Sequence, residues 1–84
     1  MMDHMKYIVV EDGWGPLPVI FHASIAHNEM MNAMKSQKDW KLVSAGFVAH
    51  RPEGLQCYGS SFTLKAKARK EDSELVSRHF GVEK

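Results

Sequence analysis

The chain has 84 residues, of which 44% are hydrophobic and 25% charged, a composition typical of one folded domain rather than a disordered segment. No apolar run approaches the roughly 20 residues that span a membrane, so we expect no contact with one. Residues 1–5 lack the apolar stretch of a signal peptide, and a second methionine at position 5 predicts that residues 1–4 are a dispensable extension of a single domain over residues 5–84.

The single cysteine, Cys57, excludes an internal disulfide and favours a cytoplasmic location. The net charge is +1, with one basic and four acidic side chains in residues 1–34 but ten basic and six acidic in residues 35–84. This asymmetry is weaker than in dedicated nucleic-acid-binding domains. Because a core of this size leaves little net stability, we expect a homodimer.

Two strands are predicted first, over residues 6–10 and 17–22. The turn-forming residues 11–16 separate them and place Trp14 between two glycines at the tip of a loop. Pro18 suits an edge strand, because it cannot donate a hydrogen bond to a neighbour. A helix is predicted over residues 27–37, where methionines recur at helical spacing.

The second half predicts a strand over residues 40–50, a turn at Arg51-Pro-Glu-Gly54, a strand over residues 55–60 and a further extended segment over residues 62–68. A helix is expected over residues 70–80. The order β-β-α-β-β-β-α indicates an α+β fold. We expect a small antiparallel sheet with both helices packed on one face.

Four blocks, Met5 to Val9, Ser44 to Val48, Cys57 to Ser61 and Arg69 to Asp72, resemble a group of small uncharacterised proteins of phages and prophages. The resemblance covers most of residues 5–80 and implies a phage or prophage context. It implies no activity and no site residue. The group often has proline where this chain has Lys70, at the first position of the last helix.

Candidates for metal binding or catalysis are few. Three histidines and the cysteine (His22, His27, His50 and Cys57) are possible zinc ligands, and Cys57 opposite His50 is a possible nucleophile pair. Their spacing matches no zinc signature, and turn histidines with a buried thiol explain them as well. We therefore predict no catalytic, cofactor-binding or metal-binding residue, and no enzyme.

Basic side chains alternate along the segment after Phe62, at Lys65, Lys67 and Arg69, with Lys70 next. On a strand they would form a ladder able to follow a phosphate backbone, with Tyr58 and Trp40 as stacking surfaces. The competing interpretation is an edge strand whose lysines prevent aggregation.

Trp14 is the strongest candidate for contact with a protein, because tryptophan often anchors interfaces. The alternative is that its ring folds back over the sheet. The sequence thus predicts a non-enzymatic interaction or accessory protein that binds itself and an unidentified protein through Trp14, Tyr58 and an open sheet edge or face. The second hypothesis is a nucleic-acid-binding module that uses residues 65–70.

Overall fold

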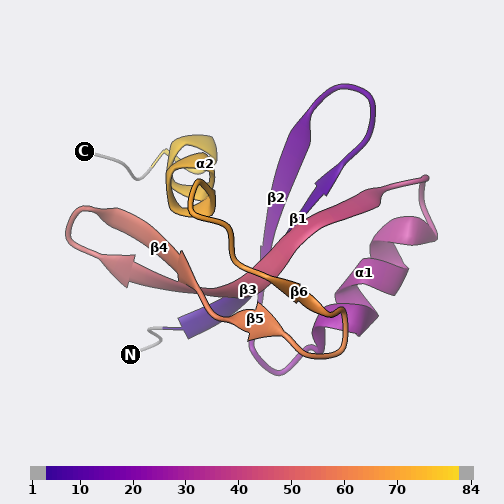
Figure 1. Ribbon diagram of the computed structural model, residues 1–84, viewed down its shortest axis with the longest axis horizontal. Coiled ribbons are helices and arrows are strands. Elements are labelled where there is room, and N and C mark those ends of the chain that lie inside the picture. The colour runs from indigo at the N-terminus through magenta and orange to yellow at the C-terminus, as the bar shows by residue number, and fades with distance from the viewer. Residues whose placement is uncertain (1–3, 82–84) are drawn as a thin grey trace.

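The computed structural model describes residues 4–81 and contains six strands and two helices (Figure 1). In chain order they are β1 (His4–Glu11), β2 (Pro16–Phe21), α1 (His27–Lys35), β3 (Lys41–Arg51), β4 (Gly54–Tyr58), β5 (Ser60–Ser61), β6 (Ala66–Lys67) and α2 (Asp72–His79). Within this range no helix is long and apolar enough to cross a membrane.

The four long strands form one antiparallel sheet in the order β2-β1-β3-β4, which confirms the predicted α+β class. β2 lies at one edge, as Pro18 suggested. The β3–β4 hairpin closes at the predicted turn, where Arg51 pairs with Gly54 and the glycine adopts a φ of 140°. Such a φ favours glycine over any other residue.

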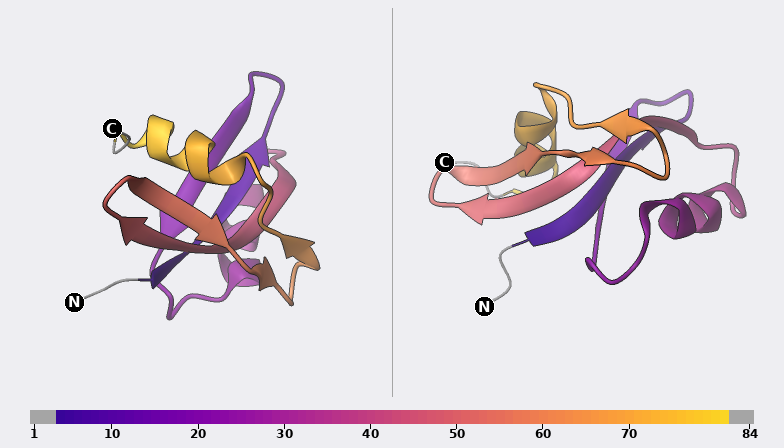
Figure 2. Two further views of the ribbon diagram at one scale, coloured as in Figure 1. Left: turned by 60° about the vertical axis from the view of Figure 1, so that its left-hand side comes forward. Right: turned by 60° about the horizontal axis from the view of Figure 1, so that its bottom comes forward.

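The two helices cover opposite faces of the sheet, so the prediction that both pack on one face is wrong (Figure 2). Side chains of β1 alternate: Ile8 and Val10 pack with Met31 of α1, whereas Tyr7 and Val9 pack with Val76 of α2. All four β1 residues are fully buried. A continuous apolar run, rather than an alternating one, is the signal of a strand covered on both faces.

Both helices are shorter than predicted. α1 ends at Lys35, where Ser36 donates its backbone N–H to Asn32 and its hydroxyl to the carbonyl of Ala33. α2 begins at Asp72 rather than at residue 70, because the Asp72 carboxylate accepts the backbone N–H of Arg69 and closes the chain into a turn there. The Asp72 side chain therefore fixes the turn that leads into α2 and does not cap a free N–H of the helix itself.

The segment over residues 62–68 is not one extended strand, as predicted, but a small hairpin. Only Ala66–Lys67 is extended, and it pairs with Ser60–Ser61. Between them, the Ser61 hydroxyl accepts the N–H of Leu64 over 3.2 Å, and Lys65 adopts a left-handed φ of 54°. A serine that bonds the backbone a few residues later favours a turn over a continuing strand.

Candidate functional site

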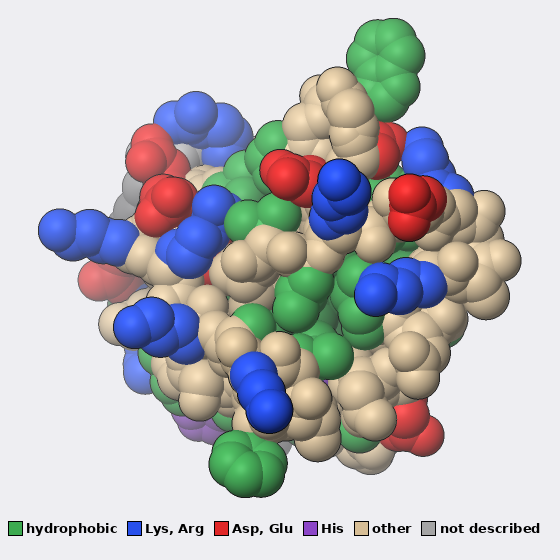
Figure 3. All heavy atoms as spheres, turned by 45° about the vertical axis from the view of Figure 1, so that its right-hand side comes forward, with side chains coloured by type: hydrophobic (Ala, Val, Ile, Leu, Met, Phe, Trp, Pro, Cys, Tyr) green, Lys and Arg blue, Asp and Glu red, His purple; other side chains and the backbone are tan. Residues whose placement is uncertain are grey.

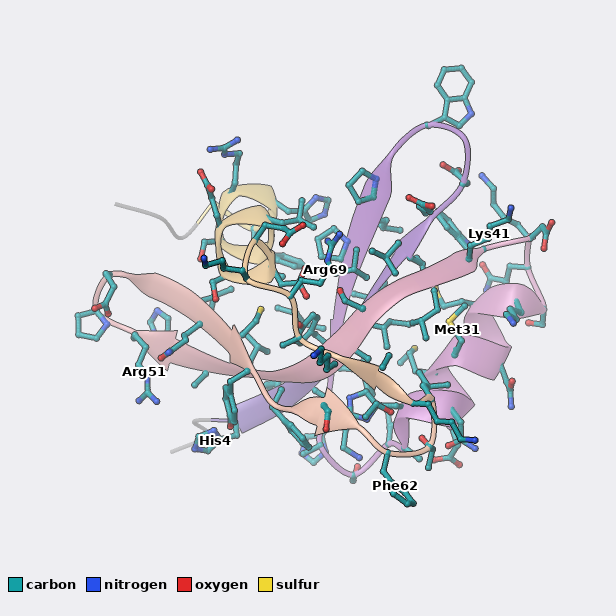
Figure 4. All side chains as sticks on the ribbon, viewed as in Figure 1. His4, Met31, Lys41, Arg51, Phe62 and Arg69 are labelled. Atoms are coloured by element: carbon teal, nitrogen blue, oxygen red, sulfur yellow. The ribbon has the colours of Figure 1, made fainter. Side chains whose placement is uncertain are left out.

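A buried ionic cluster lies between α2 and β1. It includes Arg69, one of the basic residues that were predicted to bind phosphate. The Asp72 carboxylate is fully buried and accepts hydrogen bonds from the Tyr7 hydroxyl over 2.6 Å and from two guanidinium nitrogens of Arg69 over 2.8 and 2.9 Å. Glu71 lies 3.5 Å from the same guanidinium. Arg69 therefore lies beneath α2 with its charge already paired (Figure 4).

The ionisation of Asp72 follows from these contacts. Burial alone raises the pKa of Asp72, but the hydrogen bonds from Tyr7 and Arg69 outweigh it and lower that pKa below its usual value. Ser44 Oγ is buried beside the carboxylate, and it also lowers the pKa of Asp72 without making a hydrogen bond of normal geometry. Asp72 is thus a charged anchor for the start of α2.

Cys57 and His50 do not face each other, so the predicted pair is wrong. Cys57 is opposite Val48 in the β3–β4 register, and His50 is opposite Leu55. Burial raises the pKa of the Cys57 thiol to about 11, which makes it a poor nucleophile. Within residues 4–81 no three His, Cys, Asp or Glu side chains are grouped as metal ligands.

His27 is a packing residue at the start of α1. Its ring is buried with its edge toward Phe21 and Phe47, and its Nε2–H donates to the carbonyl of Gly46 over 2.8 Å. Burial lowers the pKa of His27, so the ring is held neutral. No other residue fits at position 46, because a Cβ there would lie 2.5 Å from the carbonyl oxygen of Tyr58.

Side chains of α2 cover the outer edge of β4. The N–H of Leu55 donates to Ser77 Oγ over 2.8 Å, the same hydroxyl donates to the Leu55 carbonyl over 3.0 Å, and the N–H of Cys57 donates to Ser73 Oγ over 2.8 Å. These two serines occupy the groups that a further strand would use.

The other edge, β2, carries Pro16 and Pro18, which cannot donate to a partner strand. A helix also packs on each sheet face, so these elements disfavour the expected contact through a sheet edge or face, which stays a prediction. The most exposed large hydrophobic side chains, Trp14 and Phe62, lie on loops instead.

Trp14 is 94% exposed at the tip of the β1–β2 loop, so it does not fold back over the sheet. The loop is nevertheless braced. Asp12 Oδ1 accepts the N–H of Trp14 over 2.8 Å, and Asp12 Oδ2 pairs with Lys38 Nζ over 2.7 Å. Lys38 in turn lies 4.8 Å above the ring of Trp40. The hydrogen bond from Lys38, followed by that from the Trp14 N–H, lowers the pKa of Asp12.

A hollow of about 470 Å³ adjoins Trp14. Its charged lining has both signs, with three acidic and two basic side chains: Glu11, Asp12, Asp39, Lys38 and Lys41. Trp40, considered above as a stacking surface, instead packs against the core with Leu42. The loop therefore presents one free indole beside a surface of mixed charge.

Phe62 is a candidate binding residue that was not predicted from the sequence. Its ring is 94% exposed at the β5–β6 turn, and Figure 3 shows hydrophobic side chains standing out from both ends of the molecular surface. Lys65 and Lys67 are exposed on the same hairpin. Tyr58 is 36% exposed, stacks on Phe47 and hydrogen-bonds to His4, so it is held in place by its neighbours.

The predicted basic ladder is thus divided by the fold. Lys65 lies in the turn, Lys67 on β6, Arg69 in the buried cluster and Lys70 just before α2. The turn at Phe62 was detectable from Gly59-Ser-Ser61, a break between two apolar segments. Residues 1–3 of the predicted N-terminal extension lie outside the described residues, whereas His4 begins β1.

No family model, curated protein or solved structure matches this chain. The resemblance to phage and prophage proteins therefore stays a prediction.

Proposed function

We propose that the protein is a small non-enzymatic interaction module whose principal contact is Trp14. The observation that carries this proposal is a 94% exposed indole on a loop braced by Asp12. Exposure of a large apolar ring to water is unfavourable, and tryptophan is among the residues that contribute most to interfaces. Bracing lowers the entropy lost on binding, because the loop is already ordered.

The partner that the Trp14 loop and the hollow beside it fit best is a second copy of the chain. In a two-fold dimer the same patch meets itself, so each acidic group needs a basic group within the same patch. The hollow beside Trp14 provides both signs, with Asp39 and Lys41 among them. A Trp14-centred homodimer would also add buried area to a small core without using the blocked sheet edges.

We also propose a phage or prophage context and a cytoplasmic location for the protein. The resemblance of Ser44 to Val48 and the other three blocks supports a phage or prophage accessory protein. A single cysteine, which has no partner for an internal disulfide, suits a reducing cytoplasm. An additional, unidentified protein partner would use the same indole.

Sedimentation velocity over a wide range of protein concentration tests this proposal. We expect a monomer–dimer equilibrium that Trp14→Ala weakens about 30-fold, corresponding to a loss of about 2 kcal/mol in the free energy of association. Thermal stability of the monomer should not change, because the ring makes few contacts within the chain. Phe62→Ser is the matched control, since it removes an equally exposed ring from the other end. A monomer at every concentration, with no partner lost in pull-downs by Trp14→Ala, would contradict the proposal.

A further inference from the structure

The β5–β6 turn holds Phe62 outward on a rigid support. Leu64 points into the core on the α1 side and fixes the turn from within. The N–H of Lys65 donates to the Phe62 carbonyl over 3.3 Å, and Ala68 closes the base of the hairpin by donating to the Gly59 carbonyl over 2.9 Å. The exposed ring is therefore presented by an ordered turn and not by a loose loop.

The charged side chains of this hairpin are all basic. The chain has no aspartate or glutamate between Gly54 and Lys70. Lys65 and Lys67 are exposed beside Phe62, whereas the side chain of Arg69, one third exposed, is paired with Asp72. A shallow, mostly apolar hollow of about 390 Å³ lies at the turn and is lined by Ser60, Ser61, Phe62, Lys65, Ala66 and Lys67.

Lys65 has an unusual backbone for its residue type. Its φ of 54° makes it the one non-glycine residue with a positive φ among residues 4–81. Glycine adopts this conformation without strain, whereas a residue with a Cβ does so at some cost. Lysine at this position therefore does not stabilise the turn relative to glycine. What lysine adds is its ammonium group.

We propose that this turn binds single-stranded nucleic acid, with Phe62 stacking on a base and Lys65 and Lys67 contacting the adjoining phosphates. An aromatic ring next to lysines is the usual combination in sequence-independent single-strand binding, because every base has a face on which to stack. Hydroxyls of Ser60 and Thr63 are suitable donors to phosphate oxygens. The site goes beyond the proposed function and does not depend on Trp14.

A membrane surface is the other candidate for an exposed phenylalanine between lysines. One ring and two lysines provide little insertion, since stable membrane binding needs a larger apolar face or a lipid anchor. Leu64, the remaining large apolar side chain of the turn, packs into the core instead of facing outward. The observations therefore favour nucleic acid, and vesicles enter as an arm of the test.

The test is fluorescence anisotropy of a labelled oligothymidylate of roughly ten nucleotides, titrated with the full chain at several salt concentrations. We expect binding whose logarithmic salt slope is about −1.4, because each of two lysine–phosphate contacts contributes about −0.7 for a single strand. Phe62→Ser should weaken binding about tenfold through loss of stacking.

Lys65→Gly separates binding from folding. It relieves the backbone strain at position 65 and removes one charge, so the chain should fold as well as before while the salt slope falls by about 0.7. Lys41→Ala removes the same charge from the Trp14 end and should leave oligonucleotide binding unchanged. Trp14→Ala should leave it unchanged too, so failure of the dimer proposal does not affect this one.

Three outcomes would overturn the proposal. The first is an absence of oligonucleotide binding at low salt. The second is binding that Phe62→Ser leaves unchanged, since it would reflect charge alone. The third is Phe62-dependent binding to anionic phosphatidylserine vesicles without binding to the oligonucleotide, which would assign the turn to a membrane surface.

Discussion

The two ends of the molecule carry equally exposed aromatic rings in different electrostatic surroundings. Trp14 lies next to acids and lysines that can satisfy one another, whereas Phe62 lies on a hairpin with lysines and no acid. The supports differ too: an ion pair to Lys38 braces one loop, and a hydrogen bond from the Leu64 N–H to the Ser61 hydroxyl holds the other. An exposed ring alone therefore does not specify a partner, because the charges around it decide which ligand is attracted.

The largest effect is expected from removal of Asp72. This carboxylate pairs with Arg69, the arginine that follows the Phe62 hairpin. Asp72→Ala leaves the Arg69 charge and the Tyr7 hydroxyl without their buried partner, so we expect a loss of about 3 kcal/mol in the free energy of unfolding. Urea denaturation measures it. Glu74→Ala is the control, because the Glu74–Arg78 pair is exposed and contributes about 0.5 kcal/mol or less.

If Asp72→Ala and Glu74→Ala had similar small effects, the buried cluster would not be the anchor of α2. The charge of Arg69 would then have to be added to those of Lys65 and Lys67 on the Phe62 hairpin.

The second prediction concerns pH and His27, which belongs to neither end. The pKa of His27 is below its ordinary value of 6.5 because the ring is buried, with Lys6 adding to the effect. Below pH 6.5 the unfolded chain therefore binds more protons than the folded one, and the free energy of unfolding falls as the pH falls. The slope is at most about 1.4 kcal/mol per pH unit.

Chemical denaturation at a series of pH values between about 5 and 7 measures this slope, above the range in which carboxylates such as Asp72 titrate. His27→Gln retains a donor for the Gly46 carbonyl but cannot titrate, so it should be less pH-dependent in that range. An unchanged slope in the variant would show that the pH dependence arises elsewhere.

The smallest predicted effect sharpens the account of the Trp14 loop. Asp12→Asn keeps an acceptor for the Trp14 N–H but removes the ion pair with Lys38, so we expect self-association to weaken about threefold through a less ordered loop. Sedimentation velocity detects this change. Glu11→Gln is the matched control, as it removes an acid from the same hollow without touching the brace. Equal effects of the two variants would mean that charge, not bracing, matters.

The fold class was predictable because strand composition and turn residues are local signals. The two hairpins at residues 11–16 and 51–54 and both helices follow from such signals. The prediction that both helices pack on one face was wrong. The unbroken apolar run of β1, which is buried on both faces, indicates a helix on each side of the sheet. One strand covered on both sides requires a helix on each face.

The candidate sites were less predictable, because they depend on contacts distant in sequence. Trp14 was found, since a tryptophan between two glycines is visible in the sequence alone. Arg69 was included wrongly among free basic groups, because its pairing with Asp72 requires the turn before α2. Phe62 was missed, because a strand over residues 62–68 would have hidden the turn that exposes it.

The most direct test of the central claim, that the two ends bind independently, is a pair of titrations followed by ¹⁵N–¹H correlation NMR of the full chain. Dilution should shift the amides of residues 13–15, and the oligothymidylate should shift those of residues 61–65. We predict two sets of perturbed amides that do not overlap. One common set, or perturbation at neither end, would contradict the account.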